Sequence, residues 1–181
     1  MEEVYRDKAI DYLMSLGRLG PEQFLVTCSQ GVLLENYAAP SSRIKLARVE
    51  TISEPDEEAL LVDMGHRQAE ALLEARVIPL EKRDINSSER MIFVGRSPDN
   101  DIVVLNKLVS KLHAYFCQIP GTTVVQVVDM NSTNGTFING QRLLPSVKQR
   151  LEDADVVSFG PETRLEYFSP NGFYKLLQKL G

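Results

Sequence analysis

The sequence predicts a mainly β protein, in which a β-sandwich follows a small α+β extension and precedes a short helix. From about residue 75 onward, β-branched and aromatic runs such as "MIFVG", "HAYFCQI" and "TTVVQVVDM" are typical of short strands. Clusters rich in Gly, Pro, Asn and Asp, such as "SPDN" and "NSTNG", separate these runs at short intervals. Many short strands at regular spacing favour an all-β sandwich, which we place at residues 75–168.

The extension, residues 1–74, opens with a helical pattern. Its apolar residues recur every three or four positions, at Tyr5, Ala9, Leu13 and Leu16. The next stretch, 21–37, allows two interpretations: a short helix opened by Pro21 and followed by a strand, or a hairpin around Gly31. After it the pattern favours a strand, an acidic turn and a helix interrupted by a glycine, over residues 43–52, 53–58 and 57–75.

The last segment, residues 169–181, predicts a short amphipathic helix. Four apolar side chains fall on one side of it: Phe173, Leu176, Leu177 and Leu180. We interpret this side as a surface that packs on the sandwich rather than as a binding site for a partner. The chain shows no internal repeat and no low-complexity tract.

Composition limits the possible functions. The 181 residues are 43% hydrophobic, which is enough to bury a core. The net charge of −5, with its acidic excess in residues 1–85, argues against nucleic-acid binding. Two distant cysteines, Cys28 and Cys117, form neither a disulfide framework nor a zinc pattern, and Cys117 is expected to be buried or half-buried in a strand. Because the first ten residues are charged and no long apolar run follows, we expect a soluble cytoplasmic protein without membrane contact.

Three loops between the expected strands carry side chains that donate hydrogen bonds to oxygen. They hold a guanidinium, an ammonium, three hydroxyls and a carboxamide, on Arg96, Lys111, Ser110, Ser132, Thr133 and Asn134. A phosphate monoester has three oxygens that take such donors, and charge-assisted hydrogen bonds are roughly twice as strong as neutral ones. An Asn side chain both donates and accepts, which suits an extended peptide backbone. The set therefore predicts a phosphate pocket beside a peptide clamp.

Other polar residues have simpler interpretations. His113 opens an apolar strand and is expected to be buried and hydrogen-bonded rather than catalytic. Asp153 and Asp155 fit a turn before a strand better than a cation site, and Asn139-Gly140 fits a hairpin turn. The sequence lacks a recognisable nucleophile–base–carboxylate set and a Gly-rich nucleotide loop. We therefore expect no catalytic residue, no metal and no cofactor.

Four motifs in a fixed order carry a resemblance to a known family. "VGRSPDNDIVV", "VSKLHAYF", "VVDMNSTNGTFINGQRL" and "LEDADVVSFG" resemble the forkhead-associated (FHA) domain over roughly residues 75–168, about half of the chain. The resemblance implies an eleven-stranded β-sandwich that binds phosphothreonine peptides through loops at one end. The extension resembles those of some bacterial proteins with a single FHA domain.

The resemblance assigns five positions to the ligand. Arg96 matches the family's phosphate-binding arginine, and Ser110 matches the serine that holds the phosphate through its hydroxyl and backbone. Lys111 stands where the family often has arginine. Lysine keeps the charge but loses the planar fork, so a monodentate or water-bridged contact is expected. Thr133 matches a hydroxyl residue that also touches the phosphothreonine, and Asn134 matches the asparagine that hydrogen-bonds the peptide backbone.

Four more positions match residues that shape the loops rather than bind ligand: Gly95, His113, Gly135 and Asn139. The family prefers phosphothreonine because the threonine methyl enters a small apolar notch. A methyl group contributes only about 1 kcal/mol, so positioning must also discriminate. The family also reads residues after the phosphothreonine, often the third, and the loop near Arg142 is a candidate for that role.

The resemblance predicts a non-enzymatic adaptor or regulator. An upstream Ser/Thr kinase would phosphorylate a partner protein, and the sandwich would bind the resulting phosphothreonine. A second hypothesis concerns the chain's own Thr51 region, because "VETISEPDEE" places Thr51 in an acidic, turn-rich stretch. If a kinase modified Thr51, the phosphothreonine could occupy the protein's own pocket or that of a neighbour. Two alternatives stay open: a phosphorylation-independent scaffold that uses the extension as an interface, and an enzyme with its chemistry in residues 1–85.

Overall fold

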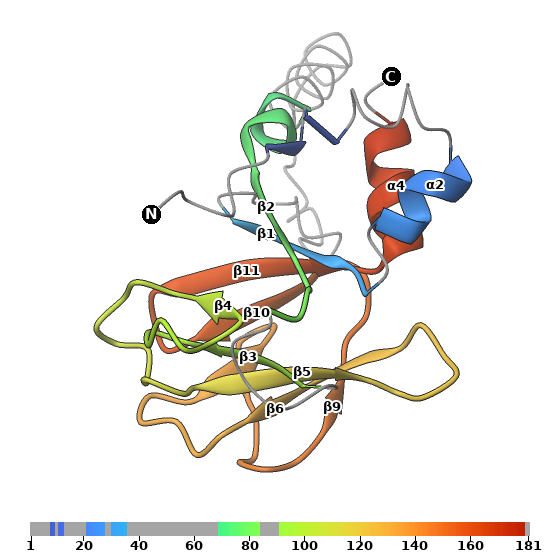
Figure 1. Cartoon of the computed structure of the whole chain (residues 1–181). Coiled ribbons are helices and arrows are strands. Elements are labelled where there is room, and N and C mark those ends of the chain that lie inside the picture. Colours follow the sequence, from blue (N-terminus) through green and yellow to red (C-terminus); the bar gives the residue numbers. More distant parts are fainter. Residues whose placement is uncertain are drawn as a thin grey trace, which may run out of the picture.

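The computed structural model describes residues 8–9, 11–12, 21–27, 30–35, 69–83 and 91–179 of the chain. Within these residues, eleven strands form two packed sheets (Figure 1). The strands are β1 (Val32–Glu35), β2 (Arg76–Pro79), β3 (Met91–Gly95), β4 (Ile102–Val103), β5 (Ala114–Gln118), β6 (Val125–Asp129), β7 (Thr136–Ile138), β8 (Gln141–Arg142), β9 (Gln149–Arg150), β10 (Asp155–Phe159) and β11 (Thr163–Phe168). The labelled helices are α2 (Pro21–Thr27) and α4 (Pro170–Gln178).

The two sheets enclose one apolar core. The larger sheet has the strand order β2-β1-β11-β10-β7-β8, and the smaller sheet has the order β4-β3-β5-β6-β9. Alternate residues of the strands point inward, as in β5, where Ala114 and Phe116 join the core. Phe159 and Tyr167 enter the same core from the larger sheet. The predicted mainly β sandwich is confirmed, with the eleven strands that the resemblance implied.

Strand β1 joins the sheet although it lies far ahead of most other strands in the sequence. Its residues pair with β2 on one side and with β11 on the other. Helix α2 precedes it, so the interpretation of a short helix followed by a strand is confirmed, and the hairpin is not formed. Gly31, at the entry to β1, has φ +97°, and a side chain there would come within 2.5 Å of the Phe168 carbonyl oxygen. The domain boundary at residue 75 stays a prediction.

A second apolar cluster covers the outer face of the larger sheet. It joins Phe24 of α2, Phe173 and Leu177 of α4, and Val32 and Leu34 of β1. The two helices lie side by side in Figure 1, and the Phe24 and Phe173 rings are 6.0 Å apart between centroids. The predicted C-terminal helix is therefore present and docks through its apolar side.

Several expectations fall outside the described residues. These are the strand at 43–52, the acidic turn at 53–58, the Thr51 region, Cys28 and Leu180. Residues 69–74 are helical, within the range where the interrupted helix was expected. In the described part of the chain, no helix combines the length and apolar character needed to cross a membrane. The same part contains no group of three or more His, Cys, Asp or Glu side chains suited to a metal ion.

Candidate functional site

The β3–β4 and β4–β5 loops run side by side and bring Arg96 next to Ser110 and Lys111. The backbone N–H of Arg96 donates to the Ser110 carbonyl oxygen over 3.0 Å. The N–H of Ser97 donates to the Lys111 carbonyl oxygen over 3.2 Å. The side chains of Arg96 and Lys111 are exposed. These two backbone bonds therefore place a guanidinium and an ammonium at the same edge of the sandwich.

Gly95 allows this close approach of the two loops. A Cβ atom at Gly95 would overlap the Lys111 carbonyl oxygen and would lie 2.9 Å from Nδ2 of Asn100. Asn100 is buried, and its Nδ2 donates to the Lys111 oxygen over 2.6 Å and to the Ser97 oxygen over 2.9 Å. Only glycine fits between these partners without displacing the loop that carries Lys111.

The β6–β7 loop meets the other two loops at Ser110. The backbone N–H of Thr133 donates to Ser110 Oγ over 3.1 Å, and the two hydroxyl oxygens are 3.4 Å apart. Asn134 is half-buried, and its Nδ2 donates to the Leu108 carbonyl oxygen over 2.7 Å. Within the described residues no donor bonds Asn134 Oδ1, so this atom can accept a hydrogen bond from a peptide N–H. Hydrogen bonds between loops thus bring all five predicted ligand residues together.

The buried side chain of His113 connects the β4–β5 and β6–β7 loops. It is fully buried, its Nδ1 accepts from the Ser110 N–H over 3.0 Å, and its Nε2 lies 3.2 Å from the Gly135 carbonyl oxygen. Because Nδ1 accepts, the proton sits on Nε2 and is donated to Gly135. Burial lowers the pKa of His113, although the bond to Gly135 and the charge of Asp129 act in the opposite direction. The expected burial and hydrogen bonding of this histidine are confirmed.

Asp129 organises the β6–β7 loop, and the sequence analysis did not single it out. It is buried at the end of β6 and accepts from the Ser132 N–H (3.0 Å), the Ser132 hydroxyl (2.6 Å) and the Thr136 hydroxyl (2.6 Å). The Ser132 hydroxyl in turn accepts from the Gly135 N–H over 3.1 Å. Ser132 therefore turns inward and supports the loop, while Thr133 stays exposed. An aspartate that ends a strand just before a Ser/Thr-rich turn is the signal that could have identified this role.

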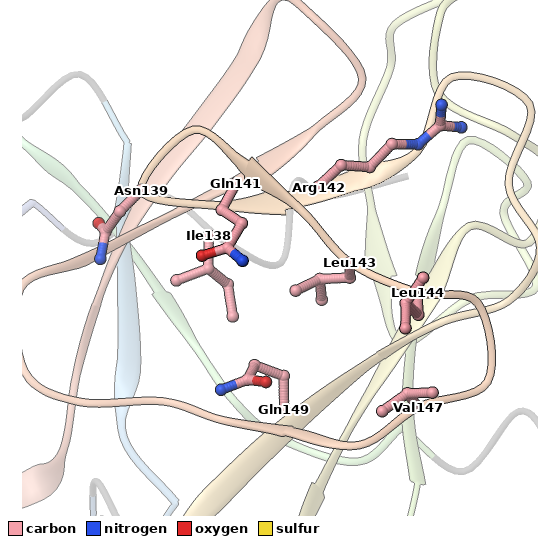
Figure 2. A pocket seen from close by; sticks show the side chains of 8 residues that line it. All are labelled: Ile138, Asn139, Gln141, Arg142, Leu143, Leu144, Val147 and Gln149. Carbon is pink, nitrogen blue, oxygen red and sulfur yellow. The ribbon is translucent and has the colours of Figure 1, made fainter.

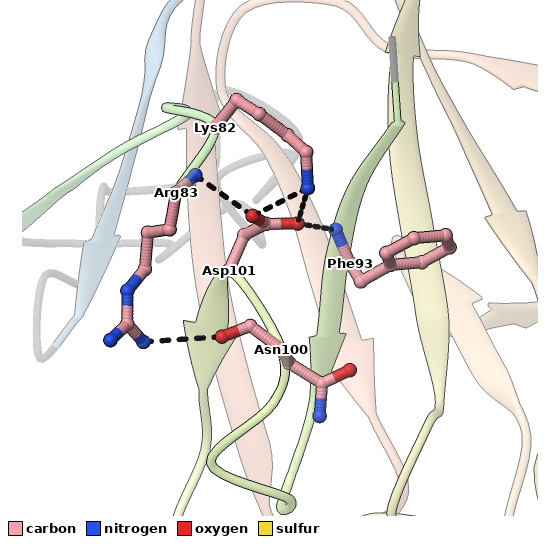
Figure 3. A network of polar contacts seen from close by, with 5 residues as sticks. All are labelled: Lys82, Arg83, Phe93, Asn100 and Asp101. Atoms are coloured by element: carbon pink, nitrogen blue, oxygen red, sulfur yellow. Dashed lines mark hydrogen bonds and ion pairs between the residues drawn. The ribbon is translucent and has the colours of Figure 1, made fainter. Parts of the chain in front are cut away.

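A second buried aspartate, Asp101, braces the β3–β4 loop (Figure 3). Its carboxylate accepts from Lys82 Nζ over 2.8 and 2.9 Å, from the Arg83 N–H over 2.8 Å and from the Phe93 N–H over 2.7 Å. The Arg83 guanidinium donates to the Asn100 carbonyl oxygen over 3.2 Å. The loop that carries Arg96 is therefore attached to residues that follow β2. No local sequence pattern indicates this link, because it joins residues 17 to 19 positions apart on either side of β3.

Two of the remaining residues lie in turns. Asn139 has φ +51°, donates to Asp155 over 2.7 Å and accepts from the Val156 N–H over 3.0 Å, so it closes the turn after β7. Asp153 accepts from the Ser169 N–H over 2.6 Å at the start of α4. The turn interpretation is confirmed for Asp153, whereas Asp155 is the first residue of β10. Cys117 is buried in β5, as expected, and within the described residues it forms no disulfide.

Gly135 connects the β6–β7 loop to a residue of a different strand. Its φ is +83°, a conformation that L side chains rarely adopt. A Cβ atom there would lie 2.5 Å from Nε of Arg142, so the Arg142 side chain of β8 packs over this glycine. The predicted ligand loop and Arg142 are therefore neighbours in space.

Known proteins resemble the part of the chain that holds these loops. Residues 92–160 match the family model described as FHA domain. A protein of Corynebacterium jeikeium named oxoglutarate dehydrogenase inhibitor is 31% identical over 104 residues, which make up 54% of this chain and 69% of that protein. An ABC transporter ATP-binding/permease protein of Mycobacterium tuberculosis is 43% identical over 67 residues, 37% of this chain and 7% of that protein.

Two further resemblances cover about half of the chain. The human nuclear inhibitor of protein phosphatase 1 is 35% identical over 86 residues, 47% of this chain and 24% of that protein. The chain thus spans less than a quarter of the length of this relative and of the transporter. Among solved structures, the MEK1 FHA domain in complex with a HOP1 phosphothreonine peptide has a TM-score of 0.42 and 26% identity, covering 51% of this chain and 87% of that chain.

Proposed function

The chain belongs to the family of proteins with an FHA domain, and on this premise we propose that it binds phosphothreonine-containing peptides. In this proposal a Ser/Thr kinase phosphorylates a partner protein, and the chain recruits that partner through Arg96, Ser110, Lys111, Thr133 and Asn134. The chain acts as an adaptor or regulator and performs no chemistry of its own. The positions that shape the site are Gly95, His113, Gly135 and Asn139.

One observation carries the proposal. Within the described residues, two positively charged side chains without an ion-pair partner lie beside hydroxyl groups whose loops are held by hydrogen bonds. Among the described residues, neither Arg96 nor Lys111 has a hydrogen bond or ion pair from its side chain, while Ser110 Oγ already accepts from the Thr133 N–H. A phosphate group, with roughly −1.5 to −2 charge and three acceptor oxygens, satisfies this arrangement. The loops need little rearrangement on binding, because hydrogen bonds between them already fix their positions.

The names of two relatives are consistent with a regulator that binds another protein. The Corynebacterium jeikeium relative is named an inhibitor of oxoglutarate dehydrogenase, and the human relative is named an inhibitor of protein phosphatase 1. Both names describe action on another protein rather than a reaction. They support recruitment as the role of this chain.

Isothermal titration calorimetry with three matched peptides tests the proposal. A peptide with phosphothreonine is expected to bind, its phosphoserine version to bind more weakly, and its unphosphorylated version not to bind. A library of phosphothreonine peptides with randomised flanking residues supplies the starting peptide. Partner binding that survives phosphatase treatment of the partner would instead support the scaffold interpretation.

Two variants assign the binding to the proposed pocket. Arg96→Ala removes the guanidinium and is expected to weaken phosphopeptide binding on the order of 100-fold, the effect of losing a charge-assisted bidentate contact. Ser110→Ala is expected to weaken it strongly as well, since it removes the hydroxyl that also accepts from Thr133. Arg164→Ala, an exposed arginine of β11, is the matched control and should bind like the wild type. Normal binding by both pocket variants would show that the pocket is misassigned.

A further inference from the structure

A groove opens between two edge strands of the sandwich, β8 and β9 (Figure 2). Its volume is about 490 Å³, within the range of roughly 300–1,000 Å³ that is usual for ligand-binding clefts. Its lining includes four apolar side chains and one amide: Ile138, Leu143, Leu144, Val147 and Gln149. The side chains of Ile138, Leu143 and Gln149 point into the open space between the strands (Figure 2).

Arg142 also lines the groove, but its charge lies on the side of the phosphopeptide site. The guanidinium points away from the middle of the groove (Figure 2), and its Nε lies over Gly135. The opposite wall, formed by β9 and the loop before it, holds none of the residues assigned to the phosphate pocket. This wall, residues 143–150, is therefore a surface of its own, and we call it the β9 surface.

The loop that leads into β9 exposes large apolar side chains. Leu144 is 72% exposed and Val147 is 49% exposed. Ser146, between them, has φ +64°, and its N–H donates to the Asp129 carbonyl oxygen over 2.9 Å. This bond fixes the loop against the end of β6. Exposed apolar side chains that lie together on a fixed loop are typical of an interaction surface.

The backbone of β9 has an open edge. Of the described strands, only β6 pairs with β9. The N–H of Leu151 donates to the Val125 carbonyl oxygen over 3.0 Å, and residues of an antiparallel pair alternate between bonding their partner and facing away from it. The N–H and C=O groups of Lys148 and Arg150 therefore point away from β6. Such groups can pair with an added strand.

The side chains of β9 alternate between two faces. Gln149 pairs with Val127, a core residue, and its side chain enters the groove (Figure 2). The side chain of Arg150 lies on the opposite, outer face, as the next residue of a strand does. Lys148 shares this outer face, because it lies near Cys117 of β5. Burial raises the pKa of Cys117, and the charge of Lys148 acts in the opposite direction.

The outer face of the β9 surface is positively charged, although the protein as a whole is acidic. Residues 135–151 contain Arg142, Lys148 and Arg150 but no Asp or Glu, whereas the chain has a net charge of −5. Lys148 and Arg150 are exposed, and within the described residues neither side chain has an ion pair or a hydrogen bond. Two β9 edges would bring like charges together if they paired with each other, so this edge favours an acidic partner over a second copy.

We propose that β9 is a docking edge for a partner protein that adds an extended, unphosphorylated strand to the smaller sheet. Because the side chains of a strand alternate, every second residue of the partner faces the groove, and the residues between them face Lys148 and Arg150. The ligand class is therefore an extended segment in which apolar residues such as Val or Leu alternate with Asp or Glu. This site goes beyond the proposed function and does not depend on it.

A helical segment would fit the β9 surface less well than a strand. A helix satisfies its own backbone groups, so it would leave the open N–H and C=O groups of β9 without partners. Its apolar residues recur every three or four positions, whereas the two faces of β9 alternate residue by residue. The ligand's backbone and its alternating pattern should therefore both be needed for binding.

Fluorescence anisotropy with labelled, unphosphorylated peptides tests this inference. The probe is a peptide in which Val and Glu alternate. One control has the same composition rearranged to helical spacing, and the other alternates Val with Lys. The Val/Glu peptide is expected to bind saturably, and both controls are expected to bind about tenfold more weakly or not at all. Equal binding by the Val/Glu peptide and its rearranged version would overturn the inference, as would no binding of the Val/Glu peptide.

Methylation of the peptide backbone distinguishes strand addition from contact through side chains alone. In an added strand, alternate N–H groups point toward β9 and the others point toward solvent. One version of the Val/Glu peptide is methylated on the Val nitrogens and the other on the Glu nitrogens. Only one of the two is expected to lose binding. If both versions bind equally, the peptide does not add to β9 as a strand and the inference is wrong.

Two variants and two matched controls locate the binding. Arg150→Glu reverses a charge beside the acidic side chains and Leu144→Ser removes an exposed apolar contact, so each should weaken binding of the Val/Glu peptide about tenfold. Arg164→Glu reverses an exposed charge on β11, and Leu105→Ser changes a side chain that is 91% exposed in the β4–β5 loop. Both controls should bind like the wild type. Equal losses in variants and controls would show that the peptide does not bind at β9.

The outcomes separate this inference from the proposed function. Arg96→Ala should lose the phosphothreonine peptide and retain the Val/Glu peptide, and Arg150→Glu should do the reverse. If only the phosphothreonine peptide binds the wild type, this inference fails and the proposed function stands. If only the Val/Glu peptide binds, the proposed function fails and this inference stands. Concentration-dependent dimerisation that disappears in Leu144→Ser would show that a second copy occupies this edge, which would contradict the inference.

Discussion

Two parts of this molecule are held together by different interactions: the binding loops and the helix cluster. Buried polar side chains hold the loops, with His113 and Asp129 hydrogen-bonded to loop backbone and hydroxyl groups. Apolar packing holds the cluster, where aromatic rings of α2 and α4 cover β1. Hydrogen bonds are directional, so they fix the positions of ligand-binding atoms more closely than apolar contact does. Apolar packing is less directional, but it stabilises a fold more per buried side chain.

The comparison predicts that the two parts respond differently to mutation. Changes in the helix cluster should alter the free energy of unfolding and leave peptide affinity unaffected. Changes at the buried polar groups beneath the loops should alter both quantities. Changes at exposed Arg96 should alter affinity alone. Four variants test this prediction, and they are ordered by the expected size of their effect.

Phe173→Ala should have the largest effect on stability. Phe173 is fully buried between α2 and the sheet, and removing such a ring typically costs about 3–5 kcal/mol of unfolding free energy. Urea unfolding measures this loss. The dissociation constant of a phosphothreonine peptide, measured at low temperature where the variant stays folded, should match that of the wild type. Phe173→Leu, which keeps most of the volume, should lose less. A large loss of affinity in the folded variant would contradict the prediction that the helix cluster affects stability alone.

Asp129→Ala should reduce both stability and affinity. The change leaves the Ser132 N–H and the hydroxyls of Ser132 and Thr136 without their buried acceptor, at a cost of about 2–3 kcal/mol. The loop that carries Thr133 should then be less well fixed, and peptide binding should weaken. Asp129→Asn keeps one acceptor oxygen and should be intermediate by both measures. If Asp129→Ala weakened binding with no loss of stability, the carboxylate would act on the ligand rather than on the loop.

Gly95→Ala should have a smaller effect on stability and a clear effect on affinity. The new Cβ overlaps the Lys111 carbonyl oxygen and must push the two loops apart, which costs about 1–3 kcal/mol for a typical overpacked site. Calorimetry should then show weaker phosphopeptide binding. Gly121→Ala is the matched control: φ is +75° there, but no atom lies within 4 Å of the added group. Its strain should lower stability slightly and leave affinity unaffected.

The sequence predicts the parts of this molecule that depend on local patterns. Strand alternation and turn residues indicated the sandwich, and "VGR", "SKLH" and "NSTNG" indicated which loops would meet. It could not predict the pairing of β1 with β11, because 127 residues separate the end of the first strand from the start of the second and no local signal selects a distant neighbour. Register between distant strands follows from burial of a shared face, which appears only once the sheets have packed.

The roles of the supporting aspartates and the groove beside Arg142 also could not be predicted from local sequence patterns. Asp101 looks like an ordinary turn residue in the sequence, and Asp129 differs from one only in its place before a Ser/Thr-rich turn. The role of each aspartate depends on the donors that surround its carboxylate. The groove beside Arg142 depends on two edge strands ending at the same side of the sandwich. Residue type predicted the ligand-binding groups well, because phosphate recognition requires particular donors. It said little about the groups that hold those donors in place.

The smallest predicted effect is the pH dependence of stability due to His113. Its pKa is lowered in the folded protein by burial, so the unfolded chain binds the proton more readily below the ordinary histidine pKa of 6.5. Stability should therefore be constant above about pH 7 and should fall as the pH drops through 6.5, by at most about 1.4 kcal/mol per pH unit. Urea midpoints at pH 7.5, 6.5 and 5.5 measure this slope above the range where most carboxylates titrate.

His113→Gln separates this histidine from other groups. Glutamine cannot be protonated in this range, so the dependence of stability on pH between pH 5.5 and 7 should become flatter. The variant should be less stable at every pH, because glutamine cannot make both hydrogen bonds of His113 with the same geometry. Protonated His113 would have a hydrogen on Nδ1 facing the Ser110 N–H, so the contact that connects two binding loops would become repulsive. Acid should thus loosen the loops before it affects the helix cluster. An unchanged slope in His113→Gln would show that the buried histidine does not contribute to the pH dependence and that the polar support beneath the loops is not its source.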